Sequence, residues 1–376
     1  MAKTLEENFN ESVYKNWDED TFRRVWTKDP SVIKEEFDLN SISKKRILIL
    51  DEIHKSKKWK QKLKGFFDIN HNLINIVVTG SARLNIFNKG SDSLLGRYIH
   101  FRLHPFSYGE LASSKSLQPE EWKCKIFSNK KLKENTEVDQ KIIKRLFNMS
   151  GFPEPYLENS TQILNIWRRS RNEKIIREDF RDLSRLPELS QDEMLASLLP
   201  EKVGSPLSVQ SLREHIEVSH DTIKRWLLYL KELYYFYELK PWTKSVKRSL
   251  KKEAKIYLYD WTSVEDNGPR FENMIGSHLL KACHYWTDTG EGDFSLYYLR
   301  NKDKQEIDFL IVKDKKPWLS IESKYSDEVI DTKTIKKFQD YIKCPHVQVL
   351  FPSDKLRKIE DNLLIISANY FLKDLP

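Results

Sequence analysis

Continuous apolar runs and an amphipathic segment alternate near the start of the chain. RILIL (46–50) and INIVV (74–78) are apolar throughout, which is typical of strands buried on both faces of a parallel sheet. Between them, residues 57–67 carry apolar side chains at helical spacing. The pattern predicts strand, helix and strand, and YIHFRL (98–103) is a candidate third strand.

A helical pattern dominates the middle of the chain. Residues 113–190 are mostly polar, rich in opposed charges and predicted to be helical. In 191–260, two amphipathic helices precede a third, for which Ser219 is a credible N-cap. The third helix has an i, i+3, i+4, i+7 apolar stripe, made of Ile223, Trp226, Leu227 and Leu230. Strands at 234–239 and 255–260 then complete a predicted winged helix-turn-helix.

Basic residues gather where a winged helix would meet nucleic acid. Lys224 and Arg225 lie off the apolar stripe of the third helix, and the loop of the following hairpin contains Lys244, Lys247, Arg248, Lys251 and Lys252. Beside a helix-turn-helix, these cations predict contacts with DNA phosphates. A solvated loop without a partner is the alternative.

The last part of the chain, 269–376, predicts a mixed domain in the order α-β-β-β-α-β. The expected elements are a helix at 271–284, strands at 294–299, 305–312 and 318–325, a helix at 334–343, and strands at 347–351 and 363–367. The second and third strands form a predicted hairpin whose turn is centred on Lys315. Ile307, Phe309, Ile311, Leu319 and Ile321 share the apolar face of this hairpin because strand side chains alternate.

The other face of the hairpin is acidic. In the predicted register Asp308 faces Glu322, Glu306 faces Lys324, and Val312 faces Trp318. Two carboxylates opposed at about 4.5–5.5 Å between Cβ atoms repel unless a cation lies between them. Mg²⁺ suits such a pair, and Lys324 could activate a metal-bound water or screen developing phosphate charge. A solvated face with a Glu306–Lys324 pair and no metal is the alternative.

Composition limits the class of protein. The 376 residues contain 64 Lys and Arg against 56 Asp and Glu, for a net charge of +8, which is compatible with a polyanionic partner. The three cysteines are isolated, so neither a disulfide scaffold nor a thiolate zinc site is expected. No apolar run approaches the ~20 residues that span a bilayer. We therefore expect a cytoplasmic protein without a membrane partner.

The strand at 46–50 ends in a second acidic pair, Asp51-Glu52. A strand ending in acids is commonplace, and it is the acidic half of a nucleotide site only if a phosphate-binding loop accompanies it. None of the 11 glycines is followed by Lys, so the sequence contains no G-x-x-x-x-G-K-[ST] loop.

Several motifs together resemble one family. YKNWDED, ILDEIHK, VTGSARL, SLLGRY and PFSYGEL, followed by RFEN, EIDFLI and IESKYS, are similar to the bacterial and archaeal AAA-type ATPases with a C-terminal domain of unknown function. The resemblance implies that Asp51 serves Mg²⁺ and Glu52 polarises the attacking water. It also implies that Thr79 or Ser81 senses the γ-phosphate of ATP, and that Arg97 acts as a finger in trans or forms a structural ion pair.

A second resemblance concerns the acidic hairpin. Asp308…Glu322-Ser323-Lys324 resembles the D…E-x-K motif of the restriction-endonuclease-like fold, in which a further metal-binding acid comes from the first helix. Glu272 is the matching position. The resemblance implies a Mg²⁺-dependent nuclease site formed by these four residues.

In the AAA family a strand and a Walker A loop precede these motifs, and here nothing precedes Met1. We therefore expect weak ATP binding or none, either because the sequence is a fragment or because the copy is degenerate. The expected fold is a multidomain α/β protein. Its parts are an incomplete AAA-type core (1–112), a helical connector (113–190), a winged helix (191–260) and a restriction-endonuclease-like domain (261–376).

Three functions stay open at this point. The first is a DNA-associated AAA relative with a nuclease-like site, and the second is a DNA-binding regulator whose acidic hairpin is inert. The third is a nucleotide switch completed by a longer gene product or a second chain. Because AAA relatives often form rings, a homo-oligomer also stays open.

Overall fold

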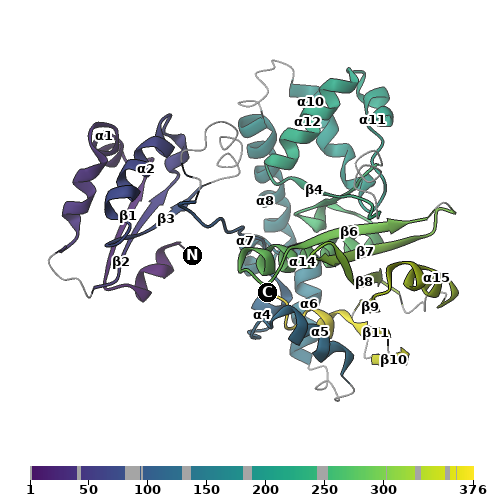
Figure 1. Cartoon of the computed structure of the whole chain (residues 1–376). Coiled ribbons are helices and arrows are strands. Elements are labelled where there is room, and N and C mark those ends of the chain that lie inside the picture. The colour runs from purple at the N-terminus through teal and green to yellow at the C-terminus, as the bar shows by residue number, and fades with distance from the viewer. Residues whose placement is uncertain are drawn as a thin grey trace. The chain divides into compact units, whose positions relative to one another are not determined.

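The structure is a computed structural model of the whole chain. It describes residues 2–39, 44–80, 94, 96–128, 137–180, 189–243, 253–301, 303–326, 332–351, 356–360 and 362–376. The chain divides into two compact units, residues 1–100 and 101–376 (Figure 1). The elements of each unit are built from local sequence signals, and each unit is described by itself.

The N-terminal unit is a three-stranded parallel sheet with helices packed on it. Its strands are β1 (Glu11–Asn16), β2 (Arg46–Asp51) and β3 (Asn75–Thr79), in the spatial order β1-β2-β3. Its helices are α1 (Asp20–Lys28) and α2 (Trp59–Asn70), with short helical segments η1 (Ala2–Asn8), η2 (Pro30–Glu36) and η3 (Ile53–Lys55). The predicted strand, helix and strand at 46–78 are confirmed. Leu48 and Leu50 of β2 pack in one core with Trp26 and Trp59.

Two features of this sheet differ from the prediction. Strand β1 was not expected, because ESVYKN lacks an apolar run and its side chains are mostly half-buried. The candidate strand at 98–103 is wrong, since these residues form no strand. Tyr98, Ile99, Phe101 and Leu103 are exposed. An alternating pattern alone cannot make a strand when no neighbour supplies a hydrogen-bonding edge.

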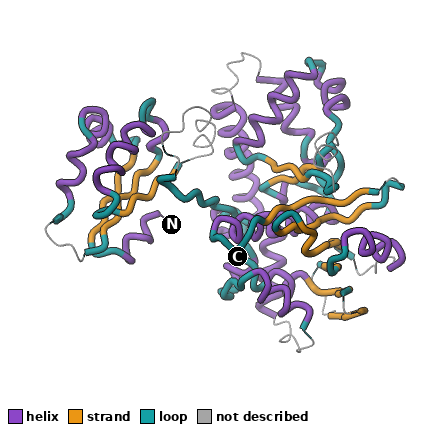
Figure 2. The backbone as a smooth tube through the Cα atoms, viewed as in Figure 1, coloured by secondary structure: helices purple, strands orange, loops and turns teal. Residues whose placement is uncertain are grey.

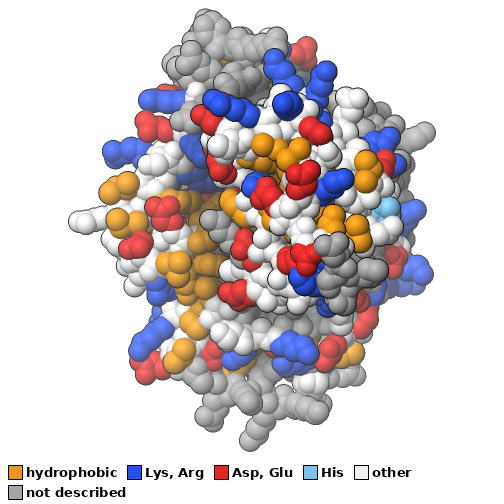
Figure 3. All heavy atoms as spheres, turned by 90° about the vertical axis from the view of Figure 1, so that its left-hand side faces the viewer, with side chains coloured by type: hydrophobic (Ala, Val, Ile, Leu, Met, Phe, Trp, Pro, Cys, Tyr) orange, Lys and Arg blue, Asp and Glu red, His pale blue; other side chains and the backbone are white. Residues whose placement is uncertain are grey.

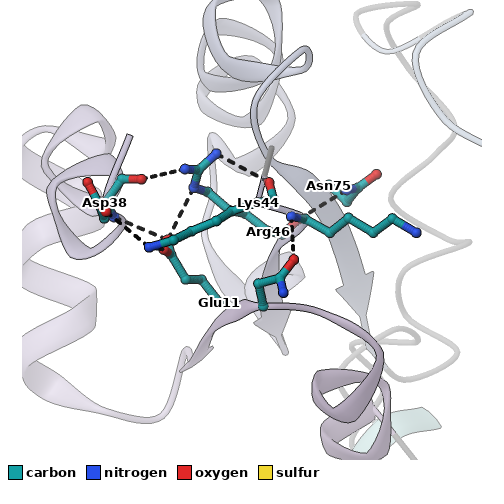
Figure 4. A network of polar contacts seen from close by, with 7 residues as sticks. Glu11, Asp38, Lys44, Arg46 and Asn75 are labelled. Atoms are coloured by element: carbon teal, nitrogen blue, oxygen red, sulfur yellow. Dashed lines mark hydrogen bonds and ion pairs between the residues drawn. The ribbon is translucent and has the colours of Figure 1, made fainter. Parts of the chain in front are cut away.

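A buried arginine ties together the starts of the strands (Figure 4). Arg46 is 1% exposed; its Nε donates to Glu11 Oε2 at 3.1 Å, and its terminal nitrogens donate to the backbone carbonyls of Lys44 and Asp38. Lys44 Nζ bonds Glu11 at 2.7 Å and Asp38 at 3.0 Å, and Asn75 donates to the Arg46 carbonyl. This network fixes the end of the sheet opposite Asp51.

The C-terminal unit begins with a helical region. Its helices are α4 (Tyr108–Leu111), α5 (Pro119–Phe127), α6 (Glu137–Met149), α7 (Pro153–Glu158), α8 (Thr161–Glu173), η4 (Lys174–Phe180), α10 (Leu189–Leu198), η5 (Pro200–Lys202), α11 (Val209–Ile216) and α12 (His220–Glu232). Ser219 caps α12, because its hydroxyl accepts a hydrogen bond from the Thr222 amide at 3.1 Å. The apolar stripe predicted for this helix is buried.

An antiparallel hairpin follows α12. It pairs β4 (Phe236–Leu239) with β5 (Lys255–Leu258). The three helices and hairpin predicted for 191–260 are thus present, and the assignment as a winged helix stays a prediction. Residues 244–252, which hold the predicted wing lysines and arginine, lie outside the described residues.

A six-stranded mixed sheet forms the rest of the unit (Figure 2). Its elements are η6 (Trp261–Ser263), α14 (Asn267–Asp288), β6 (Phe294–Arg300), β7 (Glu306–Lys313), β8 (Lys316–Lys324), α15 (Thr332–Ile342), β9 (His346–Leu350), β10 (Leu356–Glu360), β11 (Leu363–Ser367) and α16 (Ala368–Leu372). The strand order is β10-β11-β9-β8-β7-β6, with β8, β9 and β11 parallel. The predicted order α-β-β-β-α-β is present from α14 to β9, and β11 is the further strand expected at 363–367. β10 and α16 are additions.

The register of β7 and β8 agrees with the prediction in the middle of the hairpin, where Phe309 pairs with Ile321 and Ile311 with Leu319. The regular ladder does not reach Asp308, because β7 has one extra residue between Leu310 and Ile307 where it pairs with β6. The expectation that Ile307 shares a face with Phe309 is wrong, since Ile307 packs with Leu310 and Val312. The expected pairing of Val312 with Trp318 is wrong, because a bulge places Val312 opposite Pro317. The turn consists of Asp314 and Lys315, both with positive φ, as in tight two-residue hairpin turns.

Candidate functional sites

The acidic residues of β7 and β8 lie among well-defined polar partners. Asp308 is 9% exposed, and its Oδ2 accepts hydrogen bonds from the Ser323 amide at 2.8 Å and the Ser323 hydroxyl at 2.9 Å. Glu322 Oε1 lies 3.1 Å from Lys324 Nζ. Glu322 and Lys324 occupy alternate positions of β8, and Asp308 contacts the residue between them, Ser323.

The predicted helix residue joins this cluster. Glu272, in the second turn of α14, accepts a 2.7 Å hydrogen bond from the Tyr257 hydroxyl. Burial, reinforced by the Asp308 carboxylate, raises the pKa of Glu272 well above its ordinary value. The same two causes raise the pKa of Glu322. A nearby cation would lower both pKa values, because it stabilises the charged form of a carboxylate.

Sequence reasoning missed one member of the cluster. Lys255 Nζ, on β5, is 2.7 Å from Glu306 Oε2 and 3.9 Å from Glu272 Oε1, and its side chain is 3% exposed. Arg300 also pairs with Glu306, at 3.1 Å. Lys324 pairs with Glu322 instead of Glu306, so the expected Glu306–Lys324 pair is wrong. The only sequence signal for Lys255 was its place at the start of a predicted strand.

The carboxylates of this cluster offer the oxygen ligands that a hard divalent cation binds. Carboxylate oxygens are the ligands that Mg²⁺ prefers, and Asp308, Glu322 and Glu272 supply them from three elements of one unit. Within the described part of the chain, however, no three His, Cys, Asp or Glu side chains form a ready-made ligand group. Metal binding would therefore require these carboxylates to move closer together.

The second acidic pair lies at the carboxyl edge of the parallel sheet. The ends of the three strands are in register, with Asn16 beside Asp51 and Asp51 beside Thr79. Asp51 accepts hydrogen bonds from the Tyr14 hydroxyl at 2.5 Å and from the Thr79 hydroxyl. Glu52 follows in the left-handed region, with φ of 57°, and its carboxylate lies 3.5 Å from Lys55 Nζ.

The hydrogen bonds from these two hydroxyls stabilise the ionised form of Asp51. Burial alone would raise the pKa of Asp51, but the hydrogen bonds donated by Thr79 and Tyr14 outweigh it and lower the pKa below its ordinary value. The carboxylate is thus held ionised, as a metal-binding or water-orienting acid requires. Thr79, predicted as a phosphate sensor, touches Asp51 directly.

Two other residues that the sequence predicted as nucleotide contacts are Arg97 and Ser81. Arg97 pairs with Asp68, with Nε 2.7 Å from Oδ1, which is the structural ion pair that the sequence left open beside a trans-acting role. Ser81 lies outside the described residues.

The two residues of α12 that the sequence predicted as DNA contacts face solvent. Lys224 and Arg225 are exposed, while their neighbours Ile223 and Trp226 are buried. On the face of the molecule shown in Figure 3, Lys and Arg side chains are interspersed with Asp and Glu among the described residues. The basic excess of the chain therefore forms no single-sign patch there.

The sequence also matches known families. Residues 1–112 match the family described as AAA domain, and residues 267–371 match DUF4143, a domain of unknown function. The chain therefore combines an N-terminal AAA domain with a C-terminal domain of unknown function. Between them, residues 140–262 match a further domain of unknown function, DUF8612.

Two relatives match this chain over most of its length. An uncharacterised protein of Haemophilus influenzae is 23% identical over 93% of this chain and 78% of its own, and one of Methanocaldococcus jannaschii is 23% identical over 89% and 72%. A solved structure of the Aeropyrum pernix ORC1 protein in complex with DNA is 16% identical over 71% of this chain and 79% of that one. Its TM-score of 0.29 is too low to bear on function.

Among the helices that the structure describes, none is long and apolar enough to cross a bilayer.

Proposed function

We propose that the protein is a DNA-associated AAA-family protein whose C-terminal unit hydrolyses phosphodiester bonds with Mg²⁺. The observation that carries the proposal is the gathering of Asp308 of β7 with Glu322 and Lys324 of β8. Asp308 is bonded to Ser323, which lies between those two residues, and Lys324 Nζ lies 3.1 Å from Glu322. Glu272 from α14 completes the acidic set.

Each residue has a role that follows from its surroundings. Asp308, fixed by the two hydrogen bonds from Ser323, and Glu322 would hold the metal, with Glu272 as a third oxygen donor. Bound Mg²⁺ supplies charge to a phosphate oxygen and lowers the pKa of a water molecule. Lys324 is 39% exposed, so its ammonium can reach substrate, donate a hydrogen bond to a phosphate oxygen and offset the negative charge that develops there.

DNA is the substrate class that the rest of the unit favours. The exposed Lys224 and Arg225 of α12 lie on the helix that would present cations to a duplex in a winged helix. The predicted wing adds five further basic residues. Cations of this kind give affinity for any sequence, because they contact phosphates.

The experiment is a plasmid cleavage assay with the full chain in Mg²⁺. Wild type should nick or linearise supercoiled DNA, EDTA should abolish the reaction, and Asp308→Ala should be inactive. Asp340→Ala is the matched control, because Asp340 is an exposed acid on α15 of the same unit, and it should cleave like wild type. Equal cleavage by Asp308→Ala and wild type would assign the activity to a contaminant and overturn the proposal.

A second candidate is a DNA-binding regulator without nuclease activity. One observation favours it: each acid already has a partner within the protein, Asp308 with Ser323, Glu322 with Lys324, and Glu272 with Tyr257. This candidate predicts DNA binding by wild type and Asp308→Ala alike, with cleavage by neither.

For nucleotide, we propose that the polypeptide of these 376 residues binds ATP weakly or not at all. The AAA domain supplies Asp51 and Glu52, but the sequence has no Gly-Lys phosphate loop, and that loop makes most of the phosphate contacts in this class. Titration of the full chain with ATP by calorimetry tests this, and a micromolar dissociation constant would contradict it.

A further inference from the structure

Lys255 brings a buried positive charge into the carboxylate cluster from a different part of the sequence. It belongs to β5, within the region that matches DUF8612, whereas the acids belong to the region that matches DUF4143. Its residue is 2% exposed, and its ammonium lies over the ring of Tyr298, 5.3 Å from the centroid. Burying a lysine is costly unless charges of opposite sign surround it.

The strand that carries Lys255 also holds Glu272 in place. Tyr257, two residues further on the same face of β5, is fully buried and donates its hydroxyl to Glu272. Gly204, with φ of +74°, brings its backbone so close that a Cβ there would stand 3.2 Å from Glu272 Oε1. The hairpin therefore encloses Glu272 and places Lys255 between Glu272 and Glu306.

The charges of the cluster nearly balance. Four carboxylates, Glu272, Glu306, Asp308 and Glu322, face three cations, Lys255, Arg300 and Lys324, which leaves one negative charge when all are ionised. Without Lys255 the same cluster would carry two. Burial opposes the charge of Lys255, yet Glu272, Asp308 and Glu306 together raise its pKa above the ordinary value.

We propose that Lys255 is a positioning residue of the carboxylate cluster, whose buried ammonium lowers the affinity of the cluster for a divalent cation. Glu306 is its nearest acidic partner, at 2.7 Å, and also pairs with Arg300. The inference rests on the proposed function only in that the cluster binds a divalent cation.

The test measures binding of Mn²⁺ to the full chain by calorimetry, without DNA. Lys255→Met should tighten the Mn²⁺ dissociation constant by about tenfold, because it removes a like charge from a buried position near the ion. Glu306→Gln should weaken it by about tenfold for the opposite reason. The double variant Lys255→Met/Glu306→Gln should bind like wild type, since it restores the net charge.

The double variant also guards against misfolding. Removing both partners of a buried ion pair is far less disruptive than removing one, so if Lys255→Met does not fold, the double variant is compared with Glu306→Gln and should bind Mn²⁺ more tightly. Lys255→Arg keeps the charge and should retain the wild-type affinity. If Lys255 only stabilised the fold, replacing it would change the melting temperature and would leave the Mn²⁺ affinities of the folded variants equal.

The outcomes separate this inference from the proposed function. Mn²⁺ binding in the predicted order without DNA cleavage supports the role of Lys255 and overturns the nuclease. Mn²⁺ binding by Lys255→Met but not by wild type likewise supports the role of Lys255 and overturns the nuclease. Equal affinities in folded variants, or no binding by any of them, overturn the role of Lys255.

Discussion

Ser323 donates two hydrogen bonds to one oxygen of Asp308, through its backbone amide at 2.8 Å and its hydroxyl at 2.9 Å. The residue between Glu322 and Lys324 therefore fixes the acid on the neighbouring strand. These two bonds orient the carboxylate of Asp308.

Replacing Ser323 by Ala should remove the hydroxyl bond while the amide bond persists. We expect the free energy of unfolding to fall by about 1 kcal/mol, the ordinary net value of one hydrogen bond, and DNA cleavage to slow by more than this loss would explain. Urea unfolding and the plasmid assay measure the two effects. Ser295→Ala on β6 is the control, and Ser323→Ala with wild-type cleavage would show that the hydroxyl does not position Asp308.

Arg46 should be essential to the N-terminal unit. Arg46→Leu leaves Glu11 and two backbone carbonyls without their buried donor, so we expect a loss of about 3 kcal/mol in local stability. Hydrogen exchange of the β2 amides measures it. Arg23→Ala, which breaks an exposed pair with Asp20, should cost less than about 1 kcal/mol; similar losses for both variants would contradict the account.

Stability should fall as the pH drops below 6.5, because buried histidines must stay neutral. Burial lowers the pKa of His278 from 6.5 to about 4, and the ring accepts a hydrogen bond from the Tyr108 amide and contacts the Met274 carbonyl. Below pH 6.5 the unfolded chain binds a proton that the folded chain does not, so stability is present above 6.5 and is lost down to pH 4.

His278→Gln tests this linkage. It should reduce the slope of unfolding free energy against pH between 6 and 5 by about 1.4 kcal/mol per unit. Urea unfolding at several pH values gives the slope. Parallel curves for His278→Gln and wild type would show that this histidine does not contribute.

Lys224 and Arg225 should contribute to DNA affinity without regard to sequence. Replacing both by Ala should weaken binding and should reduce the slope of log K against log salt by about 0.9 for each phosphate that the protein no longer neutralises. Fluorescence anisotropy with a short duplex at several salt concentrations measures the slope. Lys144→Ala, an exposed residue on α6, is the control. An unchanged slope in the double variant would exclude α12 from the DNA interface.

The sequence predicted the acidic hairpin well because its signals are local. Alternation and the tight turn near Lys315 set the register that pairs Phe309 with Ile321. The bulge at Val312 was not predicted, because the order of apolar and polar side chains does not show where one strand has an extra residue opposite its partner. The face opposite α14 is also covered, since Leu310 and Val312 pack with Phe338 and Ile342 of α15.

Tertiary placement explains what the sequence did not predict. Lys255 and Glu306 are 51 positions apart, and only the packing of the β4-β5 hairpin beside β6 and α14 joins them. Similarly, ESVYKN becomes β1 because β2 offers it a parallel edge. For 98–103 the chain offers no such edge among the described residues, and the alternating pattern remains without a strand.

The most direct test of the central claim is single-turnover cleavage of a labelled DNA duplex by the full chain as Mg²⁺ is varied. The account predicts a rate that saturates with Mg²⁺ in wild type. Glu322→Gln should lose at least about 100-fold in rate, the lower range for a general catalytic group, while Asp340→Ala should follow wild type. Cleavage that is independent of Mg²⁺, or equal in Glu322→Gln and wild type, would contradict the claim that these carboxylates form a nuclease site.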